Sequence, residues 1–182
     1  MNTKLFSALA ITAATLSTTV ANASPYAVGE AHNKLISAVR STGIQFIING
    51  PMCDEPDAPM GYYWAYKNEF VVCQENRIKG QGIHQKEVRW TAEDLDTLRH
   101  EAHHVVQDCM NQEYRDGELG AVYKNPVEVA QMFLSEDTLW WIVNEGYAQE
   151  DDHTKVMEME AFAVAAMNDP LEQVRDINKF CF

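Results

Sequence analysis

Apolar residues recur every three or four positions along much of this chain, which is the spacing of amphipathic helices. The first such stretch opens at Ser24 and Pro25, a capping residue and a residue that suits the first turn, and it ends at Gly43. The next opens at Thr91, again a capping residue, and its apolar positions continue to Cys109. Further helices are predicted over residues 125–134, 137–146, 154–167 and 171–180.

A different pattern, rich in β-branched and aromatic residues, fills the region between the first two helices. Four runs predict strands, the middle two forming a hairpin: residues 44–48, 61–66, 70–74 and 83–90. The aromatic residues of the hairpin fit core packing on one face better than a substrate groove. They are Tyr62, Tyr63, Trp64 and Tyr66. A helix, then strands, then helices indicates an α+β fold with a small antiparallel sheet.

The first 23 residues have the pattern of an export signal. A short, positively charged start is followed by an apolar stretch over residues 5–20 and by a small-x-small cleavage site, Ala21-Asn22-Ala23. We therefore expect a signal peptide over residues 1–23, a single domain over residues 24–182, and a secreted or periplasmic product. No later stretch is apolar enough for a membrane span, so stable membrane insertion is not expected.

Charge and cysteine content narrow the class further. The 27 acidic residues outnumber the 14 lysines and arginines and give a net charge of −13, so a nucleic-acid partner is not expected. Four cysteines in an exported chain favour two disulfides, and of the three pairings we predict Cys53 with Cys73 and Cys109 with Cys181. The lack of any Cys-x-x-Cys pair argues against a cysteine-bound zinc ion.

The helix that opens at Thr91 carries the pattern His-Glu-x-x-His as His100, Glu101 and His104. Side chains four positions apart lie one turn apart on the same helix face, so both imidazoles can reach one metal ion. Glu101 projects beside them, where it can act as a general base on water. His103 is turned away from the pair, and we interpret it as a polar neighbour rather than a ligand.

Catalytic zinc usually has three protein ligands, so a carboxylate from elsewhere in the chain is required. Glu158 and Glu160 interrupt an otherwise apolar helix, where an unpaired carboxylate would be costly and a metal would be a suitable partner. Glu158 is favoured because Ala161 and Ala165 on its face let two helices approach closely. Glu160 then suits orienting a ligand histidine through its ring N–H. Glu145 stays open as another ligand.

The His-Glu-x-x-His pattern at residues 100–104, followed by Glu-x-Glu-Ala at residues 158–161, resembles the gluzincin group of zinc metallopeptidases. It resembles in particular small exported metallopeptidases of bacteria and phages. The resemblance implies a zincin-like fold, one Zn²⁺ ion held by His100, His104 and Glu158, and Glu101 as the general base. Residues 144–148 resemble instead the segment that supplies the third ligand in the aminopeptidase branch, which would map that ligand to Glu145.

We therefore expect an exported zinc metallopeptidase that acts on a peptide or protein substrate. The alternatives are a non-catalytic zinc-binding interaction module and a zinc amidase that acts on cell-wall peptides. Tyr147 or His153 is a candidate donor to the oxyanion of the tetrahedral intermediate. His32 and His84 fit surface or capping positions, and the adjacent Trp140 and Trp141 fit core packing.

Overall fold

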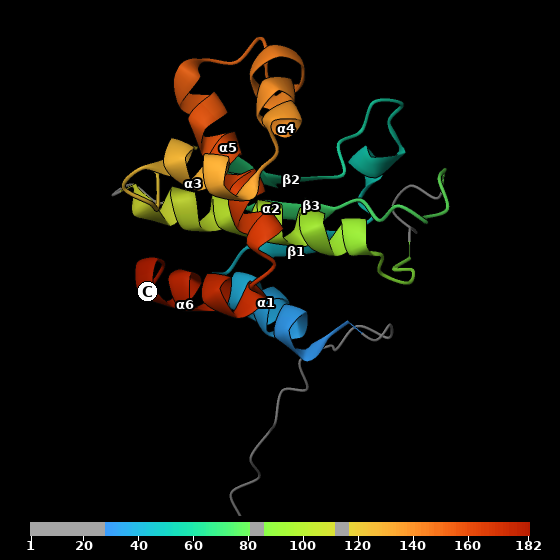
Figure 1. The fold of residues 1–182 in the computed structure, drawn as a ribbon. Coiled ribbons are helices and arrows are strands. Elements are labelled where there is room, and N and C mark those ends of the chain that lie inside the picture. Colours follow the sequence, from blue (N-terminus) through green and yellow to red (C-terminus); the bar gives the residue numbers. More distant parts are fainter. Residues whose placement is uncertain (1–27, 81–85, 112–116) are drawn as a thin grey trace, which may run out of the picture.

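A computed structural model describes residues 28–80, 86–111 and 117–182 (Figure 1). Within these residues the chain is an α+β fold of six α-helices, short 3₁₀ and π turns (η), and one three-stranded sheet. The predicted signal peptide and His84 lie outside the described residues. In chain order the elements are α1 (Glu30–Ser41), β1 (Gln45–Ile48), η1 (Pro51–Asp54), β2 (Gly61–Trp64), η2 (Ala65–Lys67), β3 (Glu69–Val72), α2 (Ala92–Met110), α3 (Pro126–Phe133), α4 (Glu136–Trp141), η4 (Ile142–Gly146), α5 (Asp152–Met167) and α6 (Pro170–Phe180).

Helix α1 starts later than its apolar pattern predicts. Ser24 and Pro25 lie outside the described residues, but Val28 and Gly29 are described and are not helical. Gly29 takes the capping position, and Glu30 follows it in the first turn, where a negative charge interacts favourably with the helix dipole. The buried face of α1 packs against α6.

The sheet has the order β1-β3-β2, so β3 is the central strand. β3 pairs antiparallel with β2, which confirms the predicted hairpin, but it pairs parallel with β1. The expectation of an antiparallel sheet was therefore wrong, and the sheet is mixed. Phe70, Val71 and Val72 in β3 are fully buried, which suits the strand with a neighbour on each side. The connection over residues 49–60 leads the chain to β2 at the far edge.

The strand predicted over residues 83–90 is not found over its described part, residues 86–90. The side chain of Gln74 takes the place of a neighbouring strand there. Its Oε1 accepts from the Val88 N–H at 2.7 Å, and its Nε2 donates to the Val88 carbonyl at 2.8 Å. Asn49 donates likewise to the Lys86 carbonyl at 2.9 Å. Because two side-chain amides satisfy this backbone, no sheet ladder is needed.

Helix α2 occupies the centre of the fold, with α1 and α6 on one side and α3, α4 and α5 on the other (Figure 1). It begins with a capping box: Thr91 accepts from the Asp94 N–H, and Asp94 accepts from the Thr91 N–H. Leu98, Ala102 and Val105 are fully buried in the main core. Since this face anchors α2 in the core, the motif residues on the neighbouring face are held firmly.

Two disulfides secure the architecture, and both predicted pairings are confirmed. Cys53–Cys73 joins η1 to the residue that follows β3, and Cys109–Cys181 joins the last turn of α2 to the end of the chain. Disulfides of this kind are typical of an oxidising compartment. None of the helices in the described residues combines the length and apolar character that a membrane crossing requires.

Candidate metal centre

Helices α2 and α5 pack against each other (Figure 1). Together they bring His100, His104 and Glu158 close to one another. The Nε2 atoms of the two histidines, one turn apart on α2, are 3.0 Å from each other. Glu158 on α5 places Oε2 3.2 Å from Nε2 of His100 and Oε1 3.5 Å from Nε2 of His104. Both histidines are buried, and the Glu158 side chain is 13% exposed. The three residues that the sequence favours as ligands therefore lie close together in the structure.

The donor atoms fit a metal ion. Two ligands about 2.0–2.1 Å from a tetrahedral ion lie about 3.3 Å from each other, close to the separations found here. Oε2 of Glu158 is buried without a hydrogen-bond partner, and two imidazole nitrogens face each other beside it. Buried polar atoms left in this state are costly. A divalent cation would satisfy all three side chains at once, so the group can bind a metal.

The electrostatic interactions among His100, His104 and Glu158 also favour a cation at this position. Burial raises the pKa of Glu158, but the neighbouring His104 and His100 outweigh burial and hold that pKa below its usual range. Burial lowers the pKa of His104, but the Glu158 carboxylate outweighs it and raises the pKa to about 9. A positive charge is therefore favoured at this position, whether a proton or a metal ion supplies it.

Gln107 fixes the orientation of the His104 ring. Its Nε2 donates to the Met157 carbonyl at 3.0 Å and to Oε2 of Glu160 at 2.8 Å, two groups that only accept. Its Oε1 must therefore face Nδ1 of His104, 2.7 Å away, and that nitrogen must carry the hydrogen. The Nε2 lone pair of His104 is thereby directed at the candidate metal position.

Glu160 is fully buried and is not a ligand in this arrangement. Its carboxylate accepts from Gln107, from the backbone N–H groups of Val122 and Tyr123, and lies 3.1 Å from Nε2 of His103. Burial raises the pKa of Glu160, but hydrogen bonds led by that from His103 lower it below the ordinary value. Glu160 thus supports a ligand histidine through Gln107, whereas its direct histidine contact is with His103.

Glu101 lies next to the three candidate ligands. It is buried, and its carboxylate accepts a hydrogen bond from the backbone N–H of Tyr63 in β2. Burial raises the pKa of Glu101, while the neighbouring His100 and His104 lower it in part. A carboxylate with a raised pKa beside a metal position has the properties of a general base.

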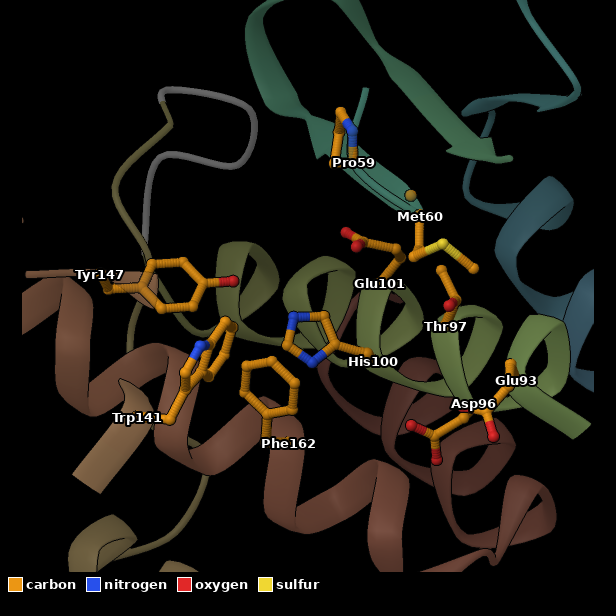
Figure 2. A pocket seen from close by; sticks show the side chains of 11 residues that line it. Pro59, Met60, Glu93, Asp96, Thr97, His100, Glu101, Trp141, Tyr147 and Phe162 are labelled. Atoms are coloured by element: carbon orange, nitrogen blue, oxygen red, sulfur yellow. The ribbon is translucent and has the colours of Figure 1, made fainter. Parts of the chain in front are cut away.

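A cavity of about 390 Å³ opens beside His100 and Glu101 (Figure 2). Trp141, Tyr147 and Phe162 form an aromatic wall, and the Phe162 ring centre is 4.4 Å from that of His100. The Tyr147 hydroxyl points toward the centre of the site in Figure 2 and hydrogen-bonds to Glu158. Burial and the Glu158 charge raise the pKa of Tyr147, so its phenol keeps its proton and can donate.

The interpretation of the tryptophan pair as core was wrong. Trp140 is 57% exposed and Trp141 is 41% exposed. Helix α4 buries none of its own residues, and the segment is anchored by Ile142 in the π-helical turn η4. The two indoles therefore stay at the surface, and Trp141 alone of the two lines the cavity.

A second cavity, of about 220 Å³, reaches the site through His104 and Glu158. Its lining includes three of the hairpin aromatics, Tyr63, Trp64 and Tyr66, and Tyr66 is 75% exposed. The expectation of core packing therefore fails for Trp64 and Tyr66, which are exposed, but holds for Tyr63, which also packs against the main core. It also holds for Tyr62, which packs against the buried cysteine pair Cys53 and Cys73.

The remaining candidates lie apart from the centre. Glu145 is exposed in η4 and does not belong to the converging group. His153 is exposed, and its Nε2 is 2.8 Å from the Leu119 carbonyl. It is not among the residues that line the two cavities described above. Gln107 was not anticipated from sequence. Its position three residues after His104, on the same helix face, was the available signal.

Residues 26–182 match the family described as "Domain of unknown function (DUF8637)", and the chain belongs to this family. No curated protein and no solved structure gives a significant match. The family description assigns no activity, so any function rests on the site itself.

Proposed function

We propose that this protein is an exported zinc-dependent metallopeptidase. The observation that supports the proposal most strongly is the convergence of His100, His104 and Glu158 directly beside Glu101 at the wall of an open cavity. Two imidazoles and one carboxylate form a ligand set used by catalytic zinc, and a site with only three protein ligands leaves a position for water or substrate. Zn²⁺ would be held by these three side chains.

Zinc bound there would lower the pKa of water and polarise a scissile carbonyl. Glu101 would accept the proton of the attacking water and pass it to the leaving amine, consistent with its raised pKa. Tyr147 would donate its phenolic hydrogen to the developing oxyanion, since its phenol is protonated and reaches the site. His153 has no role in this scheme because it lies outside both cavities.

Strand β2 offers a place for an extended peptide. It is an edge strand, and its outer side faces the site: Gly61 lines the larger cavity and the Tyr63 N–H reaches Glu101. A peptide that adds antiparallel to β2 would run from the Trp64 end toward the Gly61 end. Residues before the scissile bond would then lie at the smaller cavity, and residues after it at the larger one.

The export component of the proposal rests on the predicted signal peptide together with the two disulfides. Both bridges require oxidising conditions to form and persist, which the periplasm or the cell exterior provides. Mass spectrometry of the mature protein from its native host would give the first residue directly. We expect Ser24, and a first residue at Met1 in an exported fraction would contradict the assignment.

The decisive experiment compares the native sequence with Glu101→Gln on casein and on a peptide library. The substitution keeps the size of the side chain and removes the base, so turnover should fall by about 10²–10⁴-fold while zinc stays stoichiometric. Glu136→Gln, which changes an exposed glutamate in α4, is the matched control and should retain full activity.

Two other outcomes identify the alternatives. Stoichiometric zinc without hydrolysis of any substrate by the native protein would favour a non-catalytic zinc-binding module. Cleavage of cell-wall peptide fragments without cleavage of casein would favour an amidase. Full activity in Glu101→Gln would reject the mechanism.

A further inference from the structure

Tyr63 of strand β2 makes hydrogen bonds to α2 at two separate points. Its backbone N–H donates to the Glu101 carboxylate, and its phenolic hydroxyl donates to Oδ2 of Asp108 at 2.8 Å. On α2, Glu101 and Asp108 lie about two turns apart on the same face. A single residue of the edge strand therefore connects the candidate general base to the last turn of the helix.

Asp108 is a fixed point on the helix. It is fully buried, and the next residue, Cys109, is bonded to Cys181 near the end of the chain. A buried carboxylate is costly unless donors satisfy it, and an ionised carboxylate can only accept, so the Tyr63 hydroxyl is the donor here. Charge-assisted hydrogen bonds of this kind are shorter and stronger than those between neutral groups. The Tyr63 hydroxyl is therefore held firmly at the C-terminal end of α2.

The ring of Tyr63 is a rigid spacer between its hydroxyl and its backbone. The ring packs against the main core, and Tyr63 pairs with Phe70 across the β2–β3 hairpin. A tyrosine side chain turns about only two bonds, so a fixed hydroxyl restricts where the backbone N–H can lie. Since β2 is an edge strand that packs against α2, the hydrogen bond to Asp108 sets the position of this strand along the helix.

Glu101 depends on the position of β2, because its carboxylate accepts from the Tyr63 N–H. A general base must lie within hydrogen-bond reach of the proton that it removes, and a displacement of about 1 Å can lower a rate about 10²-fold. Asp108 does not belong to the group of candidate ligands. A change at Asp108 should therefore alter the chemical step more than it alters metal uptake.

We propose that Asp108 is a positioning residue for the general base: through the Tyr63 hydroxyl it holds the backbone of β2 where the Tyr63 N–H orients the Glu101 carboxylate. The inference rests on the proposed function, in which Glu101 takes the proton of the attacking water. It extends the residues on which catalysis depends to the last turn of α2.

The first test is Tyr63→Phe, which removes the hydroxyl and keeps both the ring and the backbone N–H. The zinc-loaded variant should lose kcat about 10- to 100-fold on the peptide that the native protein cleaves best, with KM and zinc affinity within about twofold. Tyr62→Phe is the matched control. It removes a hydroxyl from the neighbouring residue, whose ring lies on the opposite face of the sheet against Cys53 and Cys73, and it should keep full kcat. An unchanged kcat in Tyr63→Phe would overturn the proposal.

Variants at Asp108 separate positioning from stability. Asp108→Asn keeps an oxygen that accepts from the Tyr63 hydroxyl and should retain kcat within about threefold, whereas Asp108→Leu should match the loss in Tyr63→Phe. Combining Tyr63→Phe with Asp108→Leu replaces both polar partners with apolar groups, which should restore stability relative to Tyr63→Phe, where the buried carboxylate lacks this donor. The loss of kcat should persist in the double variant. Recovery of kcat together with stability would reject positioning and show that the contact only supports the fold.

Hydrogen exchange distinguishes failure of this inference from failure of the proposed function. In zinc-loaded samples the backbone amide of residue 63 should exchange about tenfold or more faster in Tyr63→Phe and in Asp108→Leu than in the native protein, and at the native rate in Tyr62→Phe. Faster exchange without any hydrolysis by the native protein would reject the peptidase and keep the link from Asp108 to Glu101. Hydrolysis with unchanged exchange and unchanged kcat in Tyr63→Phe would keep the peptidase and reject the link.

Discussion

A single buried amide decides which nitrogen of His104 is available to a cation. Gln107 has both Nε2 hydrogens committed to acceptors, the Met157 carbonyl and Glu160, so its oxygen faces Nδ1 of His104. The ring is thus held in the orientation that directs Nε2 at the candidate metal position, where a bound metal ion would take the place of the proton on Nε2. His100 has no such support, since its Nδ1 is buried without a hydrogen-bond partner.

Replacing Gln107 with leucine should weaken zinc binding about 10- to 100-fold, because the His104 ring loses the acceptor that orients it. Affinity is measured by competition with a chromophoric chelator at fixed pH. Gln173→Leu is the control: this second buried glutamine donates to the Arg99 carbonyl on α2 and does not contact a candidate ligand. Both variants should lose about 1–3 kcal/mol of stability. Equal loss of zinc affinity in both would contradict an orienting role for Gln107.

Between elements, the approach of β2 to α2 sets the position of the general base. A Cβ added at Gly61 would lie 2.5 Å from Cγ2 of Thr97, 2.9 Å from the Val71 carbonyl oxygen and 3.1 Å from Cγ of Glu101. Only glycine lets the edge strand come this near the helix. The same approach allows the Tyr63 N–H to reach the Glu101 carboxylate.

Gly61→Ala should therefore reduce peptidase activity more than zinc affinity. The added methyl group pushes β2 away from α2, shifts Glu101 and costs about 1–3 kcal/mol of stability through overpacking. Gly29→Ala serves as control, because its Cβ would meet only Nδ1 of His32, at 3.9 Å. Activity and zinc affinity are measured on the same folded samples. An unchanged kcat in Gly61→Ala would show that the close contact has no bearing on catalysis.

At the same scale, the sequence predicts helices better than the sheet. The caps at Thr91 and Asp169 and the αL residue at Asn168 are local signals, so these helix ends could be predicted within a few residues. The parallel pairing of β1 with β3 depends on a connection that no local pattern encodes. The absence of a strand over residues 86–90, the described part of the predicted strand, depends on the distant side chains of Gln74 and Asn49, which a pattern within one segment does not reveal.

Part of the candidate site was also predictable, because it depends on local spacing within single helices. His100, Glu101 and His104 follow from spacing on one helix. The choice of Glu158 over Glu160 required only the small side chains on its face. The cavity walls were not accessible in this way, because Trp141 and Met60 come from separate segments. Their exposure depends on how α4 and the chain before β2 pack.

For the molecule as a whole, the two disulfides close loops of different size around the site. The sequence separations are 20 residues for Cys53–Cys73 and 72 residues for Cys109–Cys181. In the chain-entropy model such loops stabilise a protein by about 3 and about 4 kcal/mol respectively. The longer loop contains α5 and therefore Glu158, whereas His100 and His104 precede Cys109 on α2 and lie outside the loop.

Replacing both cysteines of one bridge with serine should lower the free energy of unfolding, measured in guanidinium. The expected loss is about 3 kcal/mol for Cys53–Cys73 and about 4 kcal/mol for Cys109–Cys181. The Cys109–Cys181 variant should lose more, because its unfolded chain gains more freedom. Zinc affinity should stay within a few-fold in both variants, since neither bridge contacts a ligand. A larger loss for the Cys53–Cys73 variant would show that strain or packing, and not loop size, governs the contribution.

The affinity of the site for a metal ion should depend on pH, because a proton on His104 competes with the metal ion. Burial lowers the pKa of His104, but Glu158 outweighs it and raises the pKa to about 9, so His104 is protonated in the metal-free protein at neutral pH. Because the folded pKa lies above the unfolded value of about 6.5, this interaction stabilises the metal-free fold fully below that pH. The contribution is lost as pH rises through about 9. A metal ion must displace the same proton.

Zinc binding near pH 7 should accordingly release about one proton per chain, and the apparent affinity should rise about tenfold per pH unit until it levels near pH 9. Proton release is measured by titration calorimetry in two buffers with different ionisation enthalpies. Glu158→Gln removes the charge that raises the His104 pKa, so it should weaken binding and also flatten this dependence. His153→Ala, at an exposed histidine apart from the site, should preserve both. An affinity that does not change between pH 7 and about pH 9 would mean that His104 is already deprotonated in the free protein, and that Glu158 does not act on it as the structure indicates.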